Sequence, residues 1–230
     1  NLSKILGAHQ ITAGFTFDQS SVSYKANEIE DCELDNTRKV ICSSDSESED
    51  TAKVSGNSRT YSIFSADTFE ISEDIFITAA LRYNHTRVSN TLSTVVESSA
   101  LLVAQPKETF DYSKLNPAIG FSADFASGFN LFVNASQGNR VPTVIELGCA
   151  DKANPCLLPT GLQADPFLKQ VVSQTFEIGA RKNLNSNGVG IISVYNTDNQ
   201  DDIIFVSTDV NSGEGYFTNF GKTRNKGVDI

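Results

Sequence analysis

The sequence predicts an all-β fold, specifically an antiparallel transmembrane β-barrel segment. Three observations point there: alternating apolar and polar residues, connections that alternate between short and long, and an abundance of Gly, Ser, Thr, Asn and Asp. The hydrophobic fraction is only 39%, and no apolar run approaches the roughly 18 residues that a transmembrane helix needs. Barrel strands bury one face only, so a hydropathy average hides their lipid-facing side.

Period-two alternation marks a series of strands. In 75–84, Ile75, Ile77 and Leu81 share one side, while Thr78 and Arg82 share the other. The rhythm recurs in 11–18, 117–125, 129–136 and 175–181, and it weakens near 188–206 and 216–230. The apolar sides are therefore candidates for a lipid face and the polar sides for a lumen face.

Short and long connections alternate along the chain. Tight turns near 72–74, 126–128 and 183–187 join the strands expected at 58–70 and 75–88, 110–125 and 129–139, and 171–182 and 188–198. Long polar segments at 26–57, 89–109 and 140–170 separate these hairpins. Outer-membrane barrels have this asymmetry, with short periplasmic turns and long extracellular loops, whereas a soluble sandwich has Greek-key connections.

Aromatic residues also fall into two groups. Phe69, Phe76, Phe125 and Phe129 flank the short turns, and Tyr24, Tyr61, Tyr83 and Tyr112 lie toward the long loops. Two aromatic belts at the membrane surfaces would give this placement, and so would the general preference of aromatic residues for strands.

The net charge of −10 argues against a nucleic-acid partner, because phosphate binding needs clustered Lys and Arg. The acid is unevenly placed: residues 26–50 hold nine acids against only Arg38 and Lys39. Such a block indicates either a solvated loop or a cation-attracting vestibule.

The four cysteines form two local pairs, Cys32 with Cys42 and Cys149 with Cys156. Neither spacing is that of a zinc site. Both pairs lie in polar, turn-rich segments, so two small loop disulfides fit best. Disulfides in turn indicate an oxidising compartment, and free buried thiols are the alternative.

No catalytic, metal or cofactor site is predicted. The two histidines, His9 and His85, have no metal-ligand spacing, and no nucleophile elbow, P-loop or H-E-x-x-H occurs. The first residues lack the pattern of a signal peptide, and the last four read as the middle of a strand. We therefore expect a fragment of a longer protein.

Five segments in the second half of the chain carry a more specific signal, and each contains residues that form part of a motif. They are 111–121 (DYSKLNPAIGF, with Asn116 and Pro117), 131–143 (LFVNASQGNRVPT, with Pro142 and Thr143), 165–179 (with Glu177 and Gly179), 194–204 (VYNTDNQDDII) and 219–229 (NFGKTRNKGVD, with Asn219, Gly221 and Gly227). In this order and spacing they resemble the barrel of TonB-dependent receptors. Asn139 departs from the pattern, which usually has an aromatic residue there.

The resemblance implies a barrel of about 22 strands, plugged by an N-terminal globular domain, in the outer membrane of a Gram-negative bacterium. Residues 1–230 would then supply about eight strands of that barrel, without the plug and the barrel ends. The implied function is import of a scarce nutrient, most commonly a ferric siderophore or other metal chelate. The implied partners are outer-membrane lipid, the small-molecule ligand and the TonB complex, which acts through the plug.

Several residues are expected to have particular roles. We predict that Arg140, Glu146, Asp151 and Lys152 of the 140–170 loop, with the acidic 26–50 loop, form part of a ligand vestibule.

The chemistry of other motif residues predicts structural roles for them. Proline cannot donate to a ladder, so Pro142 should end strand pairing. Glu177 and Arg181 share the polar side and are able to pair in a lumen, and Gly179 and Gly221 should face something that packs closely.

Two other functions remain open at this point. A passive porin, or another barrel without a plug, has the same strand rhythm. A soluble secreted β-sandwich used in adhesion would bury its apolar faces against one another. An enzyme is the least favoured class.

Overall fold

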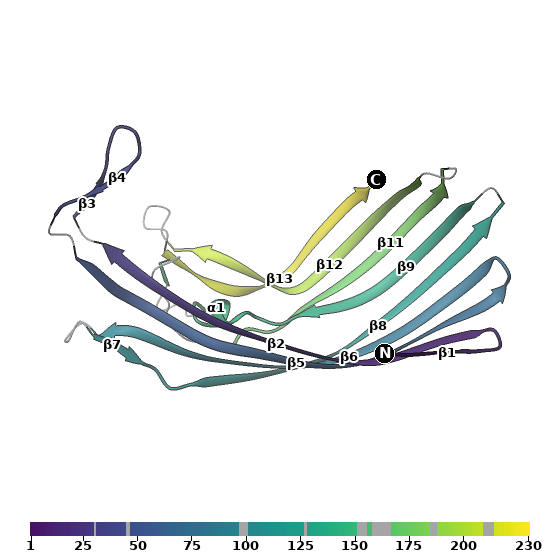
Figure 1. Cartoon of the computed structure of the whole chain (residues 1–230), viewed down its shortest axis with the longest axis horizontal. Helices are drawn as coiled ribbons and strands as arrows, with labels where there is room; N and C mark the ends of the chain where they lie inside the picture. The colour runs from purple at the N-terminus through teal and green to yellow at the C-terminus, as the bar shows by residue number, and fades with distance from the viewer. Residues whose placement is uncertain are drawn as a thin grey trace.

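One antiparallel sheet, bent into a trough, makes up most of the chain in the computed structural model (Figure 1). The structure describes residues 1–29, 31–44, 47–96, 101–126, 128–150, 156–157, 167–184, 188–208 and 214–230. Nine strands follow one another as antiparallel neighbours: β1 (Leu2–Leu6), β2 (His9–Ile29), β5 (Ser48–Ser72), β6 (Ile75–Val96), β8 (Glu108–Phe125), β9 (Phe129–Arg140), β11 (Val171–Asn183), β12 (Val189–Ser207) and β13 (Glu214–Asp229).

Short elements complete the architecture. β7 (Leu101–Ala104) pairs with β6, and β10 (Cys156–Leu157) pairs with β13. β3 (Cys32–Leu34) and β4 (Val40–Cys42) form a separate two-stranded sheet, and α1 (Val144–Leu147) is a single helical turn. Among the described residues, no helix has the length and hydropathy needed to cross a bilayer.

All the tight turns lie at one end of the trough and the long connections at the other (Figure 1). The predicted hairpins and their alternation with long connections are therefore confirmed. The β1–β2 hairpin, whose turn contains Gly7 with φ +62°, was not expected, because Leu2–Leu6 is too short to display a clear period.

The strands are longer than the sequence indicated. Much of the segments 26–57 and 89–109, which were expected to be loops, is strand, since β5 begins at Ser48 and β6 runs to Val96. On the convex side these extensions carry polar residues such as Ser55, Asn57 and Ser89, whereas on the concave side Ala52, Val54 and Leu92 are buried in the core. The apolar row of the convex face ends where a strand leaves the bilayer, so the extensions lack that period-two signal.

The two faces of the sheet meet different surroundings. α1 lies in the trough and packs with Val54 and Val88, so the side chains that share their parity line the concave face (Figure 1). The opposite, convex face carries rows of exposed apolar side chains such as Phe15, Ile63 and Leu115. The only other sheet among the described residues is β3–β4, so no sheet covers that face, and the β-sandwich alternative is wrong.

The apolar band on the convex face crosses the strands at a slant. In β2 its last member toward the long loops is Phe17, and in β13 it is Val228. Following the paired residues from Val228 across the sheet, strand by strand, leads after seven steps to His9 in β2. His9 lies eight residues before Phe17, so the edge of the band shifts by eight residues over seven strand spacings. With about 3.3 Å per residue and about 4.8 Å between strands, this offset corresponds to a tilt of roughly 40°. Strands of transmembrane barrels tilt by about this amount.

The aromatic belts are confirmed in part. Phe17, Tyr61 and Tyr83 are exposed on the convex face at the edge of the apolar band, as an interfacial belt requires. Tyr24 and Tyr112 instead pack into the concave-face core, so their position in the sequence did not reveal their side.

A charge placed on the convex face should prevent stable assembly. We expect Ile119→Arg to destabilise the barrel by about 2–4 kcal/mol, because Ile119 is 57% exposed within the apolar band. Asn225→Arg is the matched control, since Asn225 lies on the concave side in the register row of Ala118. Urea unfolding of the full-length receptor in lipid vesicles measures both, and equal stabilities would contradict the assignment of faces.

Candidate functional site

The candidate site is an inward-folded segment at the long-loop end of the trough. β9 ends at Arg140 and β11 begins at Val171, whereas the flanking strands β8 and β12 continue beyond that level. The wall therefore has a notch above β9 and β11. Residues 141–150 and 167–170, called here the strap, occupy it and pack on the concave face.

Proline explains where the notch begins. The carbonyls of Ser113 and Leu115 accept hydrogen bonds from the Gln170 and Gln137 side chains, so the odd-numbered residues of β8 direct their backbone groups toward β9. Pro117 has the same parity and no N–H to donate. Pairing of β8 with β9 stops at Ala118, the residue beside it.

Side-chain amides replace the missing ladder. Gln137 Nε2 donates to the Leu115 carbonyl over 2.9 Å, and Gln170 Nε2 donates to the Ser113 carbonyl over 2.9 Å. Tyr112 adds a bond from its hydroxyl to the Leu168 carbonyl, also over 2.9 Å. Two carbonyls at this edge of β8 are thus satisfied, one by the strap and one by a β9 side chain.

A cluster of amides fixes the upper end of β9. Asn139 Oδ1 accepts from Asn84 Nδ2 at 2.9 Å and from Asn116 Nδ2 at 2.7 Å, and Asn139 Nδ2 donates to Gln170 Oε1 at 2.9 Å. Asn139 therefore uses both its donor and its acceptor to join β6, β8 and the strap. The family's usual aromatic residue lacks an amide for these bonds.

Asn219 of β13 holds the other side of the strap. Its Oδ1 accepts from the Lys169 backbone N–H over 2.8 Å, and its Nδ2 donates to the carbonyls of Asp201 (2.8 Å) and Lys169 (3.1 Å). Asp201 has φ +50°, and the Lys169 ammonium lies 3.5 Å from its carboxylate. One asparagine thus joins three segments of backbone.

The helical turn α1 is held by a capping box. Thr143 accepts from the Glu146 backbone N–H over 3.1 Å, and the Glu146 carboxylate accepts from the Thr143 N–H over 2.7 Å. The Arg140 guanidinium donates to both Glu146 oxygens, at 2.9 and 3.0 Å, through Nη1 alone. Pro142 is fully buried where β9 pairing ends, as predicted for a ladder-terminating proline.

α1 also covers the wall. Val144 and Leu147 are buried. Val144 packs against Gly56 of β5, which has no side chain there; a Cβ on Gly56 would lie only 2.8 Å from the valine side chain. Asn90, opposite Gly56, is buried with neither side-chain polar atom bonded within the described part of the chain. Its amide is available to water or to a ligand group that enters there.

The predicted vestibule residues have different outcomes. Arg140 and Glu146 come together, but as a contact between the end of β9 and the strap, while 46% of the Arg140 side chain remains exposed. Asp151 and Lys152 lie outside the described residues. A ligand role for all four stays a prediction.

The remaining motif residues shape the wall. A Cβ on Gly179 would collide with the Phe132 ring, and one on Gly227 with Tyr195, so close packing at these glycines comes from neighbouring strands. Gly221 has open space around it within the described chain, contrary to expectation. Glu177 approaches Asn134 at 3.5 Å, and no ion pair joins it to Arg181 among the described residues.

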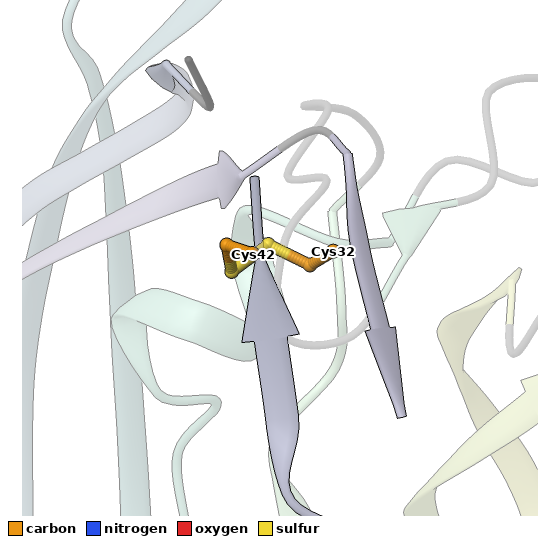
Figure 2. The surroundings of a disulfide bond; sticks show 2 residues. All are labelled: Cys32 and Cys42. Atoms are coloured by element: carbon orange, nitrogen blue, oxygen red, sulfur yellow. A yellow bond between two sulfur atoms is a disulfide. The ribbon is translucent and has the colours of Figure 1, made fainter. Parts of the chain in front are cut away.

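The acidic segment carries a stapled hairpin. Cys32 and Cys42 face each other across β3 and β4 and form a disulfide, which confirms the first pair (Figure 2). Bonds from the Thr37 hydroxyl and the Lys39 N–H lower the pKa of Asp35 in the connecting turn. Cys149 is also disulfide-bonded, but the side chain of Cys156 lies outside the described residues, so that pairing stays a prediction.

The strap and its surroundings present mainly polar groups to the trough. No cluster of three or more His, Cys, Asp or Glu side chains able to hold a metal occurs in the described parts of the chain. What the strap offers is amides, a partly exposed guanidinium and a cover over a buried asparagine.

Comparison with known proteins defines the class. A model of the family described as TonB dependent receptor-like, beta-barrel, matches residues 3–230, so the chain belongs to the TonB-dependent receptors, which lie in the Gram-negative outer membrane. A search of curated protein sequences found no match.

Solved structures agree on the fold. The ferric-catecholate import receptor Fiu from E. coli K12 aligns with TM-score 0.69 at 14% identity, over 98% of this chain and 33% of that one. The copper transporter OprC gives 0.68 at 17% identity, over 98% and 33%. The siderophore receptor PiuA from Acinetobacter baumannii gives 0.60 at 13% identity, over 98% and 33%. The chain thus spans about a third of their length.

Loss of the Asn219 amide should loosen the strap without opening the wall. Asn219→Ala removes three hydrogen bonds and leaves the Lys169 and Asp201 backbone groups unpaired, at a cost of roughly 1–3 kcal/mol for each group that stays buried. Limited proteolysis of the full-length receptor should cut within 141–170 several times faster. Cleavage at the wild-type rate would show that Asn219 does not hold the strap.

The two glycines offer a paired test of packing. Gly179→Ala should destabilise the barrel by about 1–3 kcal/mol, because the new methyl group overlaps the Phe132 ring. Gly221→Ala should have little effect, since nothing lies within 4 Å of its Cβ position. Thermal unfolding in detergent compares the two, and equal losses would refute the packing argument.

Proposed function

We propose that the full-length receptor imports a scarce metal chelate, such as a ferric siderophore, with energy from TonB acting through a plug domain. Residues 1–230 form part of its barrel. The observation that carries the proposal is the strap: a long extracellular connection folds into the trough and is held there by separable polar contacts.

The charge at the mouth favours certain cargo. Asp31, Glu33 and Asp35 surround the stapled β3–β4 hairpin, in a segment with nine acids. Such a field concentrates cations and repels anions. Neutral or cationic chelates, such as ferric hydroxamates, are therefore preferred over highly anionic catecholates. The similarity to a ferric-catecholate receptor, at 14% identity, extends to the fold alone.

Within the vestibule, Arg140 is positioned for contact with oxygen atoms of the ligand. Glu146 occupies only Nη1 of the guanidinium. Asp151 and Lys152 follow the buried strap residues Cys149 and Ala150 in the chain, and they complete the proposed ligand set. Displacement of α1 by a ligand would also expose the amide of Asn90.

Uptake of radioactive iron tests the function. Cells that produce the full-length receptor are given ferric hydroxamate or ferric catecholate, with and without TonB. Uptake should require TonB and favour the hydroxamate. Equal uptake without TonB would support a passive porin and overturn the proposal.

Loop variants test the site. The first variant replaces residues 151–166 with a short Gly-Ser linker and carries Cys149→Ala. The second replaces residues 33–41 with the same kind of linker and keeps Cys32 and Cys42. Each should reduce uptake about tenfold or more, equivalent to roughly 1.4 kcal/mol of lost binding, while the barrel assembles. Glu73→Gln with Asp74→Asn, at the short-turn end, is the control. Unchanged uptake in both loop variants would remove the vestibule hypothesis.

A further inference from the structure

The convex face carries a basic band just beyond the apolar one. The basic band comprises the first three convex-facing residues of each strand beyond the last residue of the apolar band, on the long-loop side. These residues include five bases and two acids, in a chain that has 18 bases and 28 acids overall. The bases are Arg59, Arg87, Lys222, Arg224 and Lys226, and the acids are Asp111 and Asp198. The sign of charge on this surface is thus opposite to that of the whole chain.

Two arginines at one end of the band face each other directly. Arg59 of β5 and Arg87 of β6 are register partners, one position beyond the Phe17–Tyr61 belt. Side chains in such a pair lie about 4.5–5.5 Å apart at Cβ, and like charges there repel. Arg87 binds Asp111 through Nε at 2.8 Å and Nη2 at 3.2 Å, whereas Arg59 has no hydrogen-bond or ion-pair partner among the described residues.

The other end has the same surplus. Asp198 of β12 lies between two bases, with Lys222 Nζ at 3.0 Å and Arg224 Nη2 at 3.1 Å. Lys226 follows on the same side, next to the apolar Val228, and has no partner among the described residues. Both ends therefore have a net positive charge, and about half of each Arg87, Arg224 and Lys222 side chain is exposed.

The position of the band identifies what lies against it. The long-loop end is the extracellular side, so side chains just beyond the apolar band on the convex face lie at the headgroups of the outer leaflet. The headgroups there are those of a phosphorylated glycolipid, lipopolysaccharide. Phosphate accepts charge-assisted hydrogen bonds from Arg and Lys and relieves the repulsion between them.

We propose that the convex basic band is a binding site for the phosphates of outer-leaflet lipopolysaccharide, with Arg59 and Arg87 at one end and Arg224 and Lys226 at the other. Asp111 and Asp198 fix the orientation of Arg87 and Arg224 without neutralising either end. The bound lipid would anchor the wall beside the notch on both sides. This role is independent of the cargo and of TonB.

Binding of hexa-acylated lipid A to the purified full-length receptor, measured by native mass spectrometry in mild detergent, tests the proposal. Arg59→Gln with Arg87→Gln should weaken binding roughly 25-fold, since each of the two bases near a phosphate surface contributes about fivefold. Lys114→Gln with Arg181→Gln removes the same charge from the concave face and should leave lipid A binding unchanged.

The probe itself supplies the second arm. Lipid A from which both phosphates have been removed should bind the wild-type receptor at least about 25-fold more weakly than intact lipid A, because the bases at both ends then lose their partner. This comparison needs no variant to fold. Equal affinity for phosphorylated and dephosphorylated lipid A, or a double variant that binds intact lipid A as the wild type does, would overturn the proposal.

Discussion

Backbone pairing in hydrocarbon is the constraint on which the rest of the structure depends. A bilayer core offers no water to unpaired amides, so the ladder between strands must be continuous across the apolar band and can break only beyond it. β8 and β9 obey this rule: they pair from Ala118 to Phe125, and the pairing ends where the convex face of β9 changes from Ala135 to Gln137. Pro117 lies at that boundary, where its missing N–H is harmless.

Once the ladder ends, side chains take over its work. Gln137, Gln170 and Asn219 bond backbone groups that a neighbouring strand would otherwise satisfy. Side-chain hydrogen bonds differ from a strand ladder in one respect. Each is local, so one segment can detach from the wall while the neighbouring segment stays bound. The continuous part of the wall thus provides rigidity, and the notch holds the strap, the part of the chain that the proposed ligand would displace.

The sequence was sufficient for the elements inside the bilayer and insufficient outside it. Alternation in 75–84 and 129–136 located β6 and β9, because one side of each faces an apolar phase. The same test failed for the extensions of β5 and β6 beyond the bilayer, where the convex side is polar and the few apolar residues, such as Val54 and Leu92, pack in the concave-face core. In the site, Thr143 and Glu146 form a capping box that their spacing permits, whereas no local signal joins Asn219 to Lys169, since fifty residues separate them. Contacts of that kind depend on register across several strands.

Net charge is a poor guide to such a chain, because its surfaces meet different phases. Many of the acids lie in the segment 26–50, around Asp31, Glu33 and Asp35, where the proposed cargo would approach. The convex bases instead lie at the edge of the apolar band: Arg59 is on β5, which follows the acidic segment, and Arg224 is on β13, whose Asn219 holds the strap. A single sign of charge over the whole chain would suit either the acidic segment or the convex band, but not both. Because charges are screened over about 10 Å and act locally, the proposed attraction of the wall for lipid phosphate is compatible with the proposed repulsion of anions at the mouth.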